Sequence, residues 1–583
     1  MPPHTVNSQR ALERFPLFRG IDAEARQELS TLLREIRLDA GEYLCRQGDP
    51  GDSLFLIDSG LIEVWLETST GARLVRRLRQ GDIVGEMALL TGEPRSAHVI
   101  ANVPSIVLEL NAKTFAGVAA RYPKVLNNIA LALIEREHAS AKVRLQPNRG
   151  EAVALVIDGN QLALANPVVE AFKQASPTIP IVVDLGQCLD RQSSHYHQDD
   201  LPGFLADLDN RLQKTERVLA VIPADDPHLG GLLRHMDRAV LLSNAALASQ
   251  LIDGRLAGLQ PEVFLLRGGR SKEIPSGGKV IRTANLELSA LDIAWLGRHL
   301  SRTKLGLALG AGGAKGFAHV GAFKVLENAG YVFDYVAGAS IGSILGSGIA
   351  MGMSAETLAE TAHWLLSRDV CGSYFRLVSS APEEPGHELF YEALSKLAGG
   401  RSFEDLPVPL GIMTADLNAK QPFLFRTGPL VDALHAALAI PGLAPPFERE
   451  NQRLVDGVTI SPVPTQALKD MGADITVSIN LMSRDDLERW PEDDPVPELK
   501  KRRSKTLDPM IETLIMLQTD TSVRNAAEAD VVITPLFAPS SWRDIHLADR
   551  FKAAGQRAAD KQLHKLKALA PATETPPAPK VRQ

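Results

Sequence analysis

A serine set between two glycines is the clearest candidate for chemistry in this 583-residue chain. Ser340 lies in the stretch GASIG (338–342), which follows an apolar, strand-like run and precedes a helix-like run of small residues. A tight strand–turn–helix connection needs glycines such as Gly338 and Gly342, and it lifts the serine hydroxyl above the helix N-terminus as a nucleophile elbow. The same pattern is also compatible with close packing of a helix on a strand in a glycine-rich chain.

A serine hydroxyl becomes a good nucleophile only when a base accepts its proton. Asp456 is the best candidate, because Asp456-Gly457 ends a short apolar stretch and begins a proline-rich loop, where functional groups are common. An ordinary Asp-Gly turn is the alternative. A Ser-His-Asp triad stays open, without support from the pattern. The histidines downstream of Ser340 stand in helix-like, loop or polar segments, and they are His363, His387, His435 and His546.

A glycine-rich turn, LGAGGAKGF (309–317), comes before the serine and joins a strand-like run to a helix-like one. The free N–H groups of such a turn bind an anion, which could belong to a nucleoside triphosphate, a dinucleotide or a reaction intermediate. Gly316 follows Lys315 where a phosphate-binding NTPase loop needs Ser or Thr, so that use is excluded. The dinucleotide fingerprint matches weakly, because its last glycine falls one place late and the next strand ends on Ser340 instead of an acidic residue.

The chain contains, in this order, a glycine turn with a basic residue, a Gly-x-Ser-x-Gly motif and an Asp-Gly pair. This ordered set resembles that of the patatin-like phospholipases, which hydrolyse acyl esters of lipids with a Ser-Asp dyad. The resemblance implies that Ser340 is the nucleophile and Asp456 its base. It also implies that the backbone N–H groups of Gly312 and Gly313 form the oxyanion hole, where one donor is worth on the order of 3 to 4 kcal/mol. No metal and no catalytic cofactor are expected.

Three further residues in and after the glycine turn bear on this resemblance. The family usually has three consecutive glycines, and Ala311 stands where the first of them falls. Alanine keeps its N–H, but a positive φ at that position would be costly. Lys315 either steers an anionic head group or pairs with a local carboxylate, and we favour the structural role. His319 falls on the helix after the turn, where we expect packing and no chemistry.

The N-terminal part carries a second motif, VGEMALLTGEPRSAHVIA (84–101). Residues 41–65 before it alternate short apolar strands with glycine and aspartate turns, as in an antiparallel roll. Glu86 begins a short helix and Arg95 follows a turn, which places them at opposite ends of one pocket. Such a pocket suits a sugar phosphate, because the carboxylate accepts a ribose hydroxyl and the guanidinium grips a phosphate through two hydrogen bonds.

This motif resembles the phosphate-binding cassette of cyclic-nucleotide-binding domains. The resemblance implies that Gly85, Glu86, Arg95 and Ser96 hold cyclic AMP or cyclic GMP as a regulatory ligand, and Ser96 leaves the base preference open. The alternative is a domain that has kept its fold and lost its ligand. No helix-turn-helix follows, since the helix-like stretch 125–145 leads to a strand-like run, so DNA binding is not expected.

Residues 150–300 alternate strand-like and helical runs, which predicts a parallel α/β segment. His195, His197 and Asp199 could suggest a metal cluster, but no fourth ligand is spaced to join them, and a solvated loop is the better interpretation. The order of sensor, α/β segment and hydrolase resembles the neuropathy target esterase group of lysophospholipases.

We therefore expect a multidomain chain. Its predicted parts are a β-roll cyclic-nucleotide-binding domain (14–148), an α/β intervening domain (150–300), an α/β patatin-like hydrolase with a central, mostly parallel sheet (303–566) and a disordered, proline-rich tail (571–583).

Composition sets the remaining expectations. A formal net charge of −7 argues against a nucleic-acid partner, and three scattered cysteines, Cys45, Cys188 and Cys371, fit a reducing cytoplasm. No uninterrupted apolar run is long enough to cross a bilayer, so contact with the inner membrane surface would be peripheral. The basic run 500–505 could attract anionic lipid, but neighbouring acids favour a solvated loop.

The expected function is hydrolysis of phospholipid or lysophospholipid acyl esters by a cytoplasmic serine hydrolase under cyclic-nucleotide control. The competing interpretation is a cyclic-nucleotide-responsive scaffold whose hydrolase domain is silent. Intact Ser340 and Asp456 argue against the scaffold.

Overall fold

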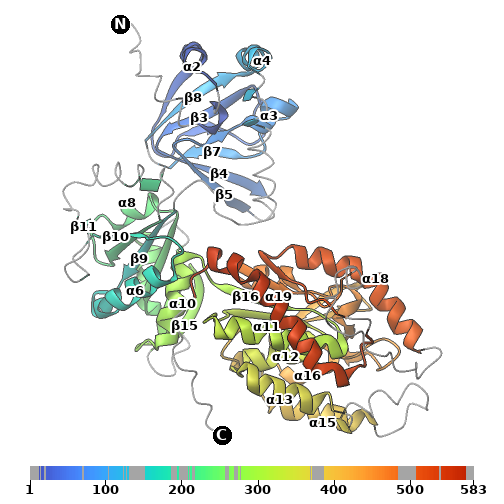
Figure 1. Cartoon of the computed structure of the whole chain (residues 1–583). Coiled ribbons are helices and arrows are strands. Elements are labelled where there is room, and N and C mark those ends of the chain that lie inside the picture. The colour runs from blue at the N-terminus through green and yellow to red at the C-terminus, as the bar shows by residue number, and fades with distance from the viewer. Residues whose placement is uncertain are drawn as a thin grey trace, which may run out of the picture. The chain divides into compact units, whose positions relative to one another are not determined.

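The structure is a computed structural model, and Figure 1 shows how its elements follow one another along the chain. The described residues are 12, 15–18, 21–68, 71–102, 104–122, 124–125, 128–129, 151–185, 189, 194–195, 208, 211–212, 217–256, 261–267, 274–275, 278–367, 369–370, 386–483, 507–537 and 540–572. The chain folds into two compact units. One unit is Met1–Asn166 with Pro180–Glu287, and the other is Pro167–Ile179 with Leu288–Gln583.

Several sequence predictions fall outside the described residues. These are Cys188, His197, Asp199, Cys371, the basic run 500–505 and residues 573–583 of the tail. Within the described residues, no group of three or more His, Cys, Asp or Glu is arranged to hold a metal ion. The described helices also include none with the length and apolar character needed to cross a bilayer.

The first unit begins with a β-roll of two antiparallel four-stranded sheets, in the orders β1-β8-β3-β6 and β2-β7-β4-β5. Its strands are β1 (Arg34–Leu38), β2 (Tyr43–Cys45), β3 (Ser53–Ser59), β4 (Leu61–Thr68), β5 (Gly71–Arg79), β6 (Ile83–Val84), β7 (His98–Ala101) and β8 (Ser105–Asn111). Its helices are α2 (Ala23–Ser30), α3 (Glu86–Thr91) and α4 (Ala112–Arg121). Alternating residues of β3 serve two cores, since Leu54 and Leu56 pack with one hydrophobic cluster and Phe55 and Ile57 with another.

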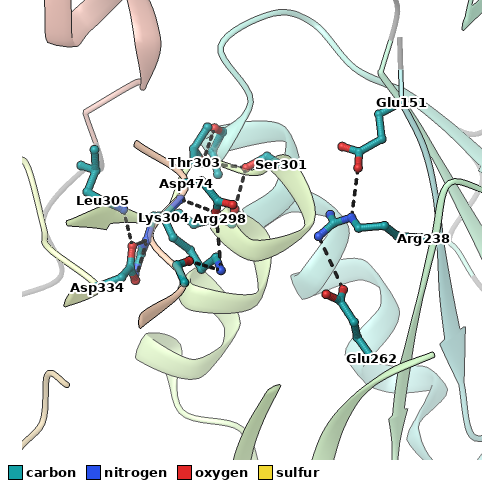
Figure 2. Close-up of polar contacts among 12 residues, drawn as sticks. Glu151, Arg238, Glu262, Arg298, Ser301, Thr303, Lys304, Leu305, Asp334 and Asp474 are labelled. Atoms are coloured by element: carbon teal, nitrogen blue, oxygen red, sulfur yellow. Dashed lines mark hydrogen bonds and ion pairs between the residues drawn. The ribbon is translucent and has the colours of Figure 1, made fainter. Parts of the chain in front are cut away.

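A seven-stranded, fully parallel sheet follows in the order β11-β10-β12-β9-β13-β14-β15, which confirms the predicted α/β segment. Its strands are β9 (Glu151–Ile157), β10 (Ile181–Asp184), β11 (Ser194–His195), β12 (Arg217–Pro223), β13 (Arg238–Ser243), β14 (Glu262–Arg267) and β15 (Lys279–Asn285). The helices between its strands include α8 (Leu229–Arg234) and α9 (Ala245–Asp253), whereas α6 (Ala165–Ala175), which follows β9 in the chain, belongs mostly to the second unit. Figure 2 shows Arg238 joining Glu151 at 3.0 Å and Glu262 at 3.5 Å, so one guanidinium ties the first residues of three adjacent strands.

The second unit holds the third sheet, in the order β20-β21-β18-β17-β16-β22-β23, with β19 paired to β18. The five strands from β18 to β23 in this order are parallel, whereas β19 and β21 run antiparallel to β18, which confirms the mostly parallel sheet. The strands are β16 (Leu305–Leu309), β17 (Tyr335–Ala339), β18 (Leu410–Asp416), β19 (Gln421–Phe425), β20 (Phe447–Arg449), β21 (Gln452–Asp456), β22 (Ile475–Ile479) and β23 (Val531–Ile533).

Helices cover this sheet. They are α10 (Ala290–Ser301), α11 (Phe317–Asn328), α12 (Ile341–Ala350), α13 (Ala355–Leu365), α15 (Gly386–Ala398), α16 (Leu430–Ala437), α17 (Thr465–Met471), α18 (Leu507–Ala527) and α19 (Ala548–Leu569). α19 passes across α11 in Figure 1, and the two helices are in direct contact. A Cβ on Gly321 would collide with the Lys552 carbonyl oxygen, and one on Gly555 with that of Ala318. Glycine at both positions therefore sets how closely the C-terminal helix packs on the helix after the glycine turn.

A buried ion pair between two side chains fixes the start of the third sheet. In Figure 2 the Arg298 guanidinium from α10 meets Asp334 through both carboxylate oxygens, at 2.7 to 3.2 Å. Asp334 Oδ2 also accepts the Leu305 N–H at 3.0 Å. Because Leu305 begins β16, this contact clamps α10 to the strand that ends at the glycine turn.

Candidate functional site

Ser340 occupies a sharp turn between β17 and α12. Its backbone has φ 54° and ψ −127°, a conformation that residues other than glycine rarely adopt. A Cβ on Gly338 would strike the carbonyl oxygen of Gly342, and a Cβ on Gly342 would strike that of Leu309. Both glycines are thus sterically required for the turn, as a nucleophile elbow demands.

Sheet register brings Asp456 to this turn from 116 positions further along the chain. Thr414 of β18 pairs with Asp456 of β21, and Met413, the residue before it, pairs with Ala339 of β17. Ser340 Oγ donates a hydrogen bond to Asp456 Oδ2 at 2.6 Å. The aspartate is fully buried and the serine is 7% exposed, so the pair lies in a nearly dry environment.

Backbone contacts orient the Asp456 carboxylate. Its Oδ1 accepts the Val458 N–H at 2.8 Å, and its own N–H donates to the Ala439 carbonyl at 3.1 Å. Burial raises the pKa of the Asp456 carboxyl from 3.8 to about 7, while the hydrogen bonds from Ser340 and Val458 act in the opposite direction. A carboxylate with a pKa near neutrality can take a proton from a hydroxyl and return it later in a catalytic cycle.

The glycine turn runs from the end of β16 into a short 3-10 helix, Gly313–Gly316. Most of its N–H groups already donate to a backbone carbonyl. Gly310 donates to Ile479, Ala311 to Pro462, Ala314 to Trp542 and Lys315 to Gly312, at distances of 2.8 to 3.2 Å. In the described part of the chain, the N–H groups of Gly312 and Gly313 have no such acceptor. These two are the donors that the family resemblance assigns to the oxyanion hole.

Close packing holds these two glycines. A Cβ on Gly312 would lie 2.7 Å from Leu481 Cδ1. One on Gly313, whose φ is +57°, would lie 2.7 Å from the Trp542 carbonyl oxygen. Ala311 is buried and does not have a positive φ, and it packs in an apolar cluster with Val458 and Met482. The alanine in place of the usual first glycine therefore causes no backbone strain.

The remaining polar candidates lie around this centre. The Lys315 ammonium stands 4.8 Å from the centroid of the Phe537 ring. His319 is buried and meets the Gly310 carbonyl through Nε2 at 2.7 Å. The sequence pattern predicted packing alone for this histidine and gave no sign of the polar contact.

The downstream histidines are engaged elsewhere. His363 packs on Phe317, His435 packs on Tyr391, and His546 lies 3.9 Å from Asp544. The His387 side chain lies outside the described part of the chain. Among the described side chains, no histidine is hydrogen-bonded to Ser340 or Asp456, so a triad has no geometric support.

The second motif lies between β6 and β7. Gly85 has φ +90°, and a Cβ there would collide with Arg95 Nη1. Glu86, the first residue of α3, and Arg95 are both buried, and Arg95 Nη1 donates to the Gly85 carbonyl at 3.2 Å. Arg95 Cζ also lies 5.2 Å from the Phe55 ring centroid, while Ser96 is exposed. The motif thus concentrates a carboxylate and a guanidinium within the roll.

Comparisons with known proteins match the two parts of the chain that hold these candidate sites. The family model described as cyclic nucleotide-binding domain matches residues 35–122, and the one described as patatin-like phospholipase matches residues 307–469. An uncharacterised NTE family protein of Mycobacterium bovis is 25% identical over 472 residues, which cover 79% of this chain and 78% of the relative.

Two named relatives are longer. Lysophospholipase NTE1 of Mycosarcoma maydis is 24% identical over 549 residues, covering 77% of this chain and 29% of that protein. Patatin-like phospholipase domain-containing protein 6 of Mus musculus is 23% identical over 521 residues, covering 77% of this chain and 38% of that protein.

These findings, with the fold, define a lipid ester hydrolase that also carries a cyclic nucleotide-binding domain. The chain carries a cyclic nucleotide-binding domain and a patatin-like phospholipase domain, and the relatives it resembles over most of its length include proteins named as NTE family members.

The strain at Ser340 gives a first prediction. Glycine tolerates the backbone conformation that Ser340 adopts, whereas alanine keeps the unfavourable Cβ. We expect Ser340→Gly to be more stable than Ser340→Ala by about 1 to 2 kcal/mol. Calorimetric unfolding of the two variants measures the difference, and equal or reversed stability would contradict a strained elbow.

Proposed function

We propose that the chain hydrolyses acyl esters of phospholipids or lysophospholipids through a Ser340–Asp456 dyad. The observation that carries this proposal is the 2.6 Å hydrogen bond from the Ser340 hydroxyl to a fully buried carboxylate. The two N–H groups of Gly312 and Gly313 support it, because they lack an acceptor among the described residues.

In the proposed mechanism, Ser340 Oγ attacks the acyl carbonyl carbon while Asp456 takes the hydroxyl proton. The carbonyl oxygen becomes an oxyanion and receives hydrogen bonds from the N–H groups of Gly312 and Gly313. Collapse breaks the ester bond, and Asp456 gives its proton to the departing alcohol. Water then attacks the acyl-serine with Asp456 again as base, which releases the fatty acid and restores Ser340.

The surroundings of the dyad support a lipid substrate. Ala311, Val458 and Met482 form an apolar cluster beside the catalytic loops, and Leu514 and Ile515 of α18 pack against it. The next two residues of that helix, Met516 and Leu517, are 66% and 65% exposed. We include peripheral contact with a lipid surface in this proposal, and the name of the fungal relative favours lysophospholipids as substrates.

Cyclic nucleotide binding at Gly85, Glu86, Arg95 and Ser96, with control of hydrolysis, is the remaining part of the proposal. Buried Glu86 and Arg95 in the matched domain support it. A nucleotide can regulate catalysis only if it binds two conformations with different affinity.

The central test measures fatty-acid release from lysophosphatidylcholine. We expect Ser340→Ala and Asp456→Asn each to lower the rate on the order of 10³-fold or more, since they remove the nucleophile and its base. Ser343→Ala is the matched control, because its buried hydroxyl lies one turn further along α12 and has no hydrogen-bond partner among the described residues. If the wild-type protein released no fatty acid, the silent scaffold would be the better interpretation. If Asp456→Asn kept its activity, the dyad mechanism would be wrong.

The raised pKa of Asp456 predicts a pH dependence. The base must be ionised to accept a proton, so kcat/KM should fall about tenfold per pH unit below pH 7 and level off above it. A water-soluble aryl ester avoids changes in lipid aggregation during the titration. A profile that stays flat down to pH 5 would be inconsistent with Asp456 as the base.

Arg95 provides the test of nucleotide binding. Arg95→Gln removes a charged donor, and we expect the Kd for cyclic AMP or cyclic GMP to rise roughly 10- to 100-fold in calorimetric titrations. Arg37→Gln, an exposed arginine on β1 of the same roll, serves as the control. Absence of binding to the wild-type protein would identify a domain that has lost its ligand.

A further inference from the structure

His319 occupies an unusual position for a histidine in a hydrophobic core. It lies on the first turn of α11, has no exposed surface, and sits among apolar helix residues such as Phe317 and Ala318. Its Nε2 is 2.7 Å from the carbonyl oxygen of Gly310, the first residue after β16. Its Nδ1 is buried and has no hydrogen-bond partner among the described residues.

The partner of Nε2 fixes the state of the ring. A carbonyl oxygen only accepts hydrogen bonds, so Nε2 carries the proton and the bare Nδ1 lone pair faces the core. Burial lowers the pKa of His319 to about 4, although the bond to Gly310 acts in the opposite direction. The imidazole is therefore a neutral donor at the pH where the hydrolase is expected to act.

The Gly310 carbonyl is the point where the two halves of the active site meet. The peptide between Gly310 and Ala311 is held at both ends, by His319 at the carbonyl and by Pro462 at the Ala311 N–H. On the elbow side, a Cβ at Gly342 would come within 3.0 Å of the same Gly310 oxygen. This peptide lies directly before the two residues whose N–H groups lack an acceptor among the described residues, Gly312 and Gly313.

We propose that His319 is a positioning residue for the oxyanion loop. Its neutral Nε2–H fixes the Gly310 carbonyl and thereby the direction of the N–H groups of Gly312 and Gly313, without contact with substrate. This inference rests on the proposed hydrolase function. It is tested separately from that function, because wild-type activity and its loss in Ser340→Ala are measured in the same experiment.

The experiment compares His319→Leu, which keeps bulk but removes the donor, with His319→Gln, whose side-chain amide can place an N–H near the Nε2 position. We expect His319→Leu to lower kcat about 10- to 100-fold with KM changed by less than about twofold, and His319→Gln to recover most of the loss. His299→Leu is the matched control, since His299 is a buried histidine on α10, stacked on Trp295.

Inhibition gives a readout that a purely structural role would not move. A trifluoromethyl ketone adds to the serine and forms an oxyanion, so its Ki should rise in His319→Leu by the same factor as kcat/KM falls. If His319→Leu is folded and retains wild-type kcat, or if kcat falls while this Ki stays unchanged, the positioning role is wrong. Failure of His319→Gln to recover activity while folded would also overturn it.

A measurement on the wild-type protein covers the case in which the variants do not fold. In ¹⁵N-histidine-labelled protein, we expect one imidazole to remain a neutral Nε2–H tautomer at pH 5 and to shift when a fluorophosphonate modifies Ser340. If no histidine combines these two properties, the proposal fails.

Discussion

The hydrogen bond between Ser340 and Asp456 is the interaction around which the candidate site of the second unit is arranged. It joins two strands that are not neighbours in the sheet, because β18 lies between β17 and β21. Its carboxylate is fully buried, so ionisation is opposed by desolvation and the pKa is raised. A carboxylate whose pKa lies near neutral pH suits a reaction in which the same group takes up and releases a proton.

Several backbone approaches exist only because glycine stands at the point of contact. Gly338 and Gly342 allow the elbow, and Gly312 and Gly313 lie against Leu481 and Trp542. The wall behind the glycine turn is in turn fixed by buried polar contacts, since Asn480 accepts hydrogen bonds from Met482 N–H and Ser522. The geometry of the candidate site is therefore set mainly by backbone packing, and only a few side chains orient the Ser340–Asp456 pair directly.

The sequence predicted the elbow and the three-part architecture because these depend on local patterns: Gly-x-Ser-x-Gly between a strand and a helix, and alternating strand-like and helical runs. It also placed Asp456 at the end of a strand. It could not predict that this strand runs antiparallel beside β18, since register over such separations depends on tertiary packing.

Other features depended on contacts that no pattern encodes. In the sequence, His319 is indistinguishable from a packing residue on an apolar helix face. Only the folded turn brings the Gly310 carbonyl to its ring. The effect of Ala311 could not be judged from sequence either, because its cost depends on a φ angle that the turn sets. The bidentate contact of Arg298 with Asp334 likewise joins residues that are 36 positions apart and meet only in the folded, buried interior.

That last contact constrains how any nucleotide effect could reach the dyad. The chain enters the second unit for the last time at Leu288 and continues through α10 into β16, which is only five residues long and ends at the glycine turn. Arg298 and Asp334 fix the near end of this strand, and His319 fixes the peptide just beyond its far end. A packed strand held at both ends transmits a displacement as a rigid element rather than absorbing it. Asp334 also directly precedes β17, which ends beside Ser340, so the same ion pair holds the strand that leads to the elbow. A small movement of α10 would therefore act on the glycine turn and on the elbow together, and regulation through this route would change kcat more than substrate binding.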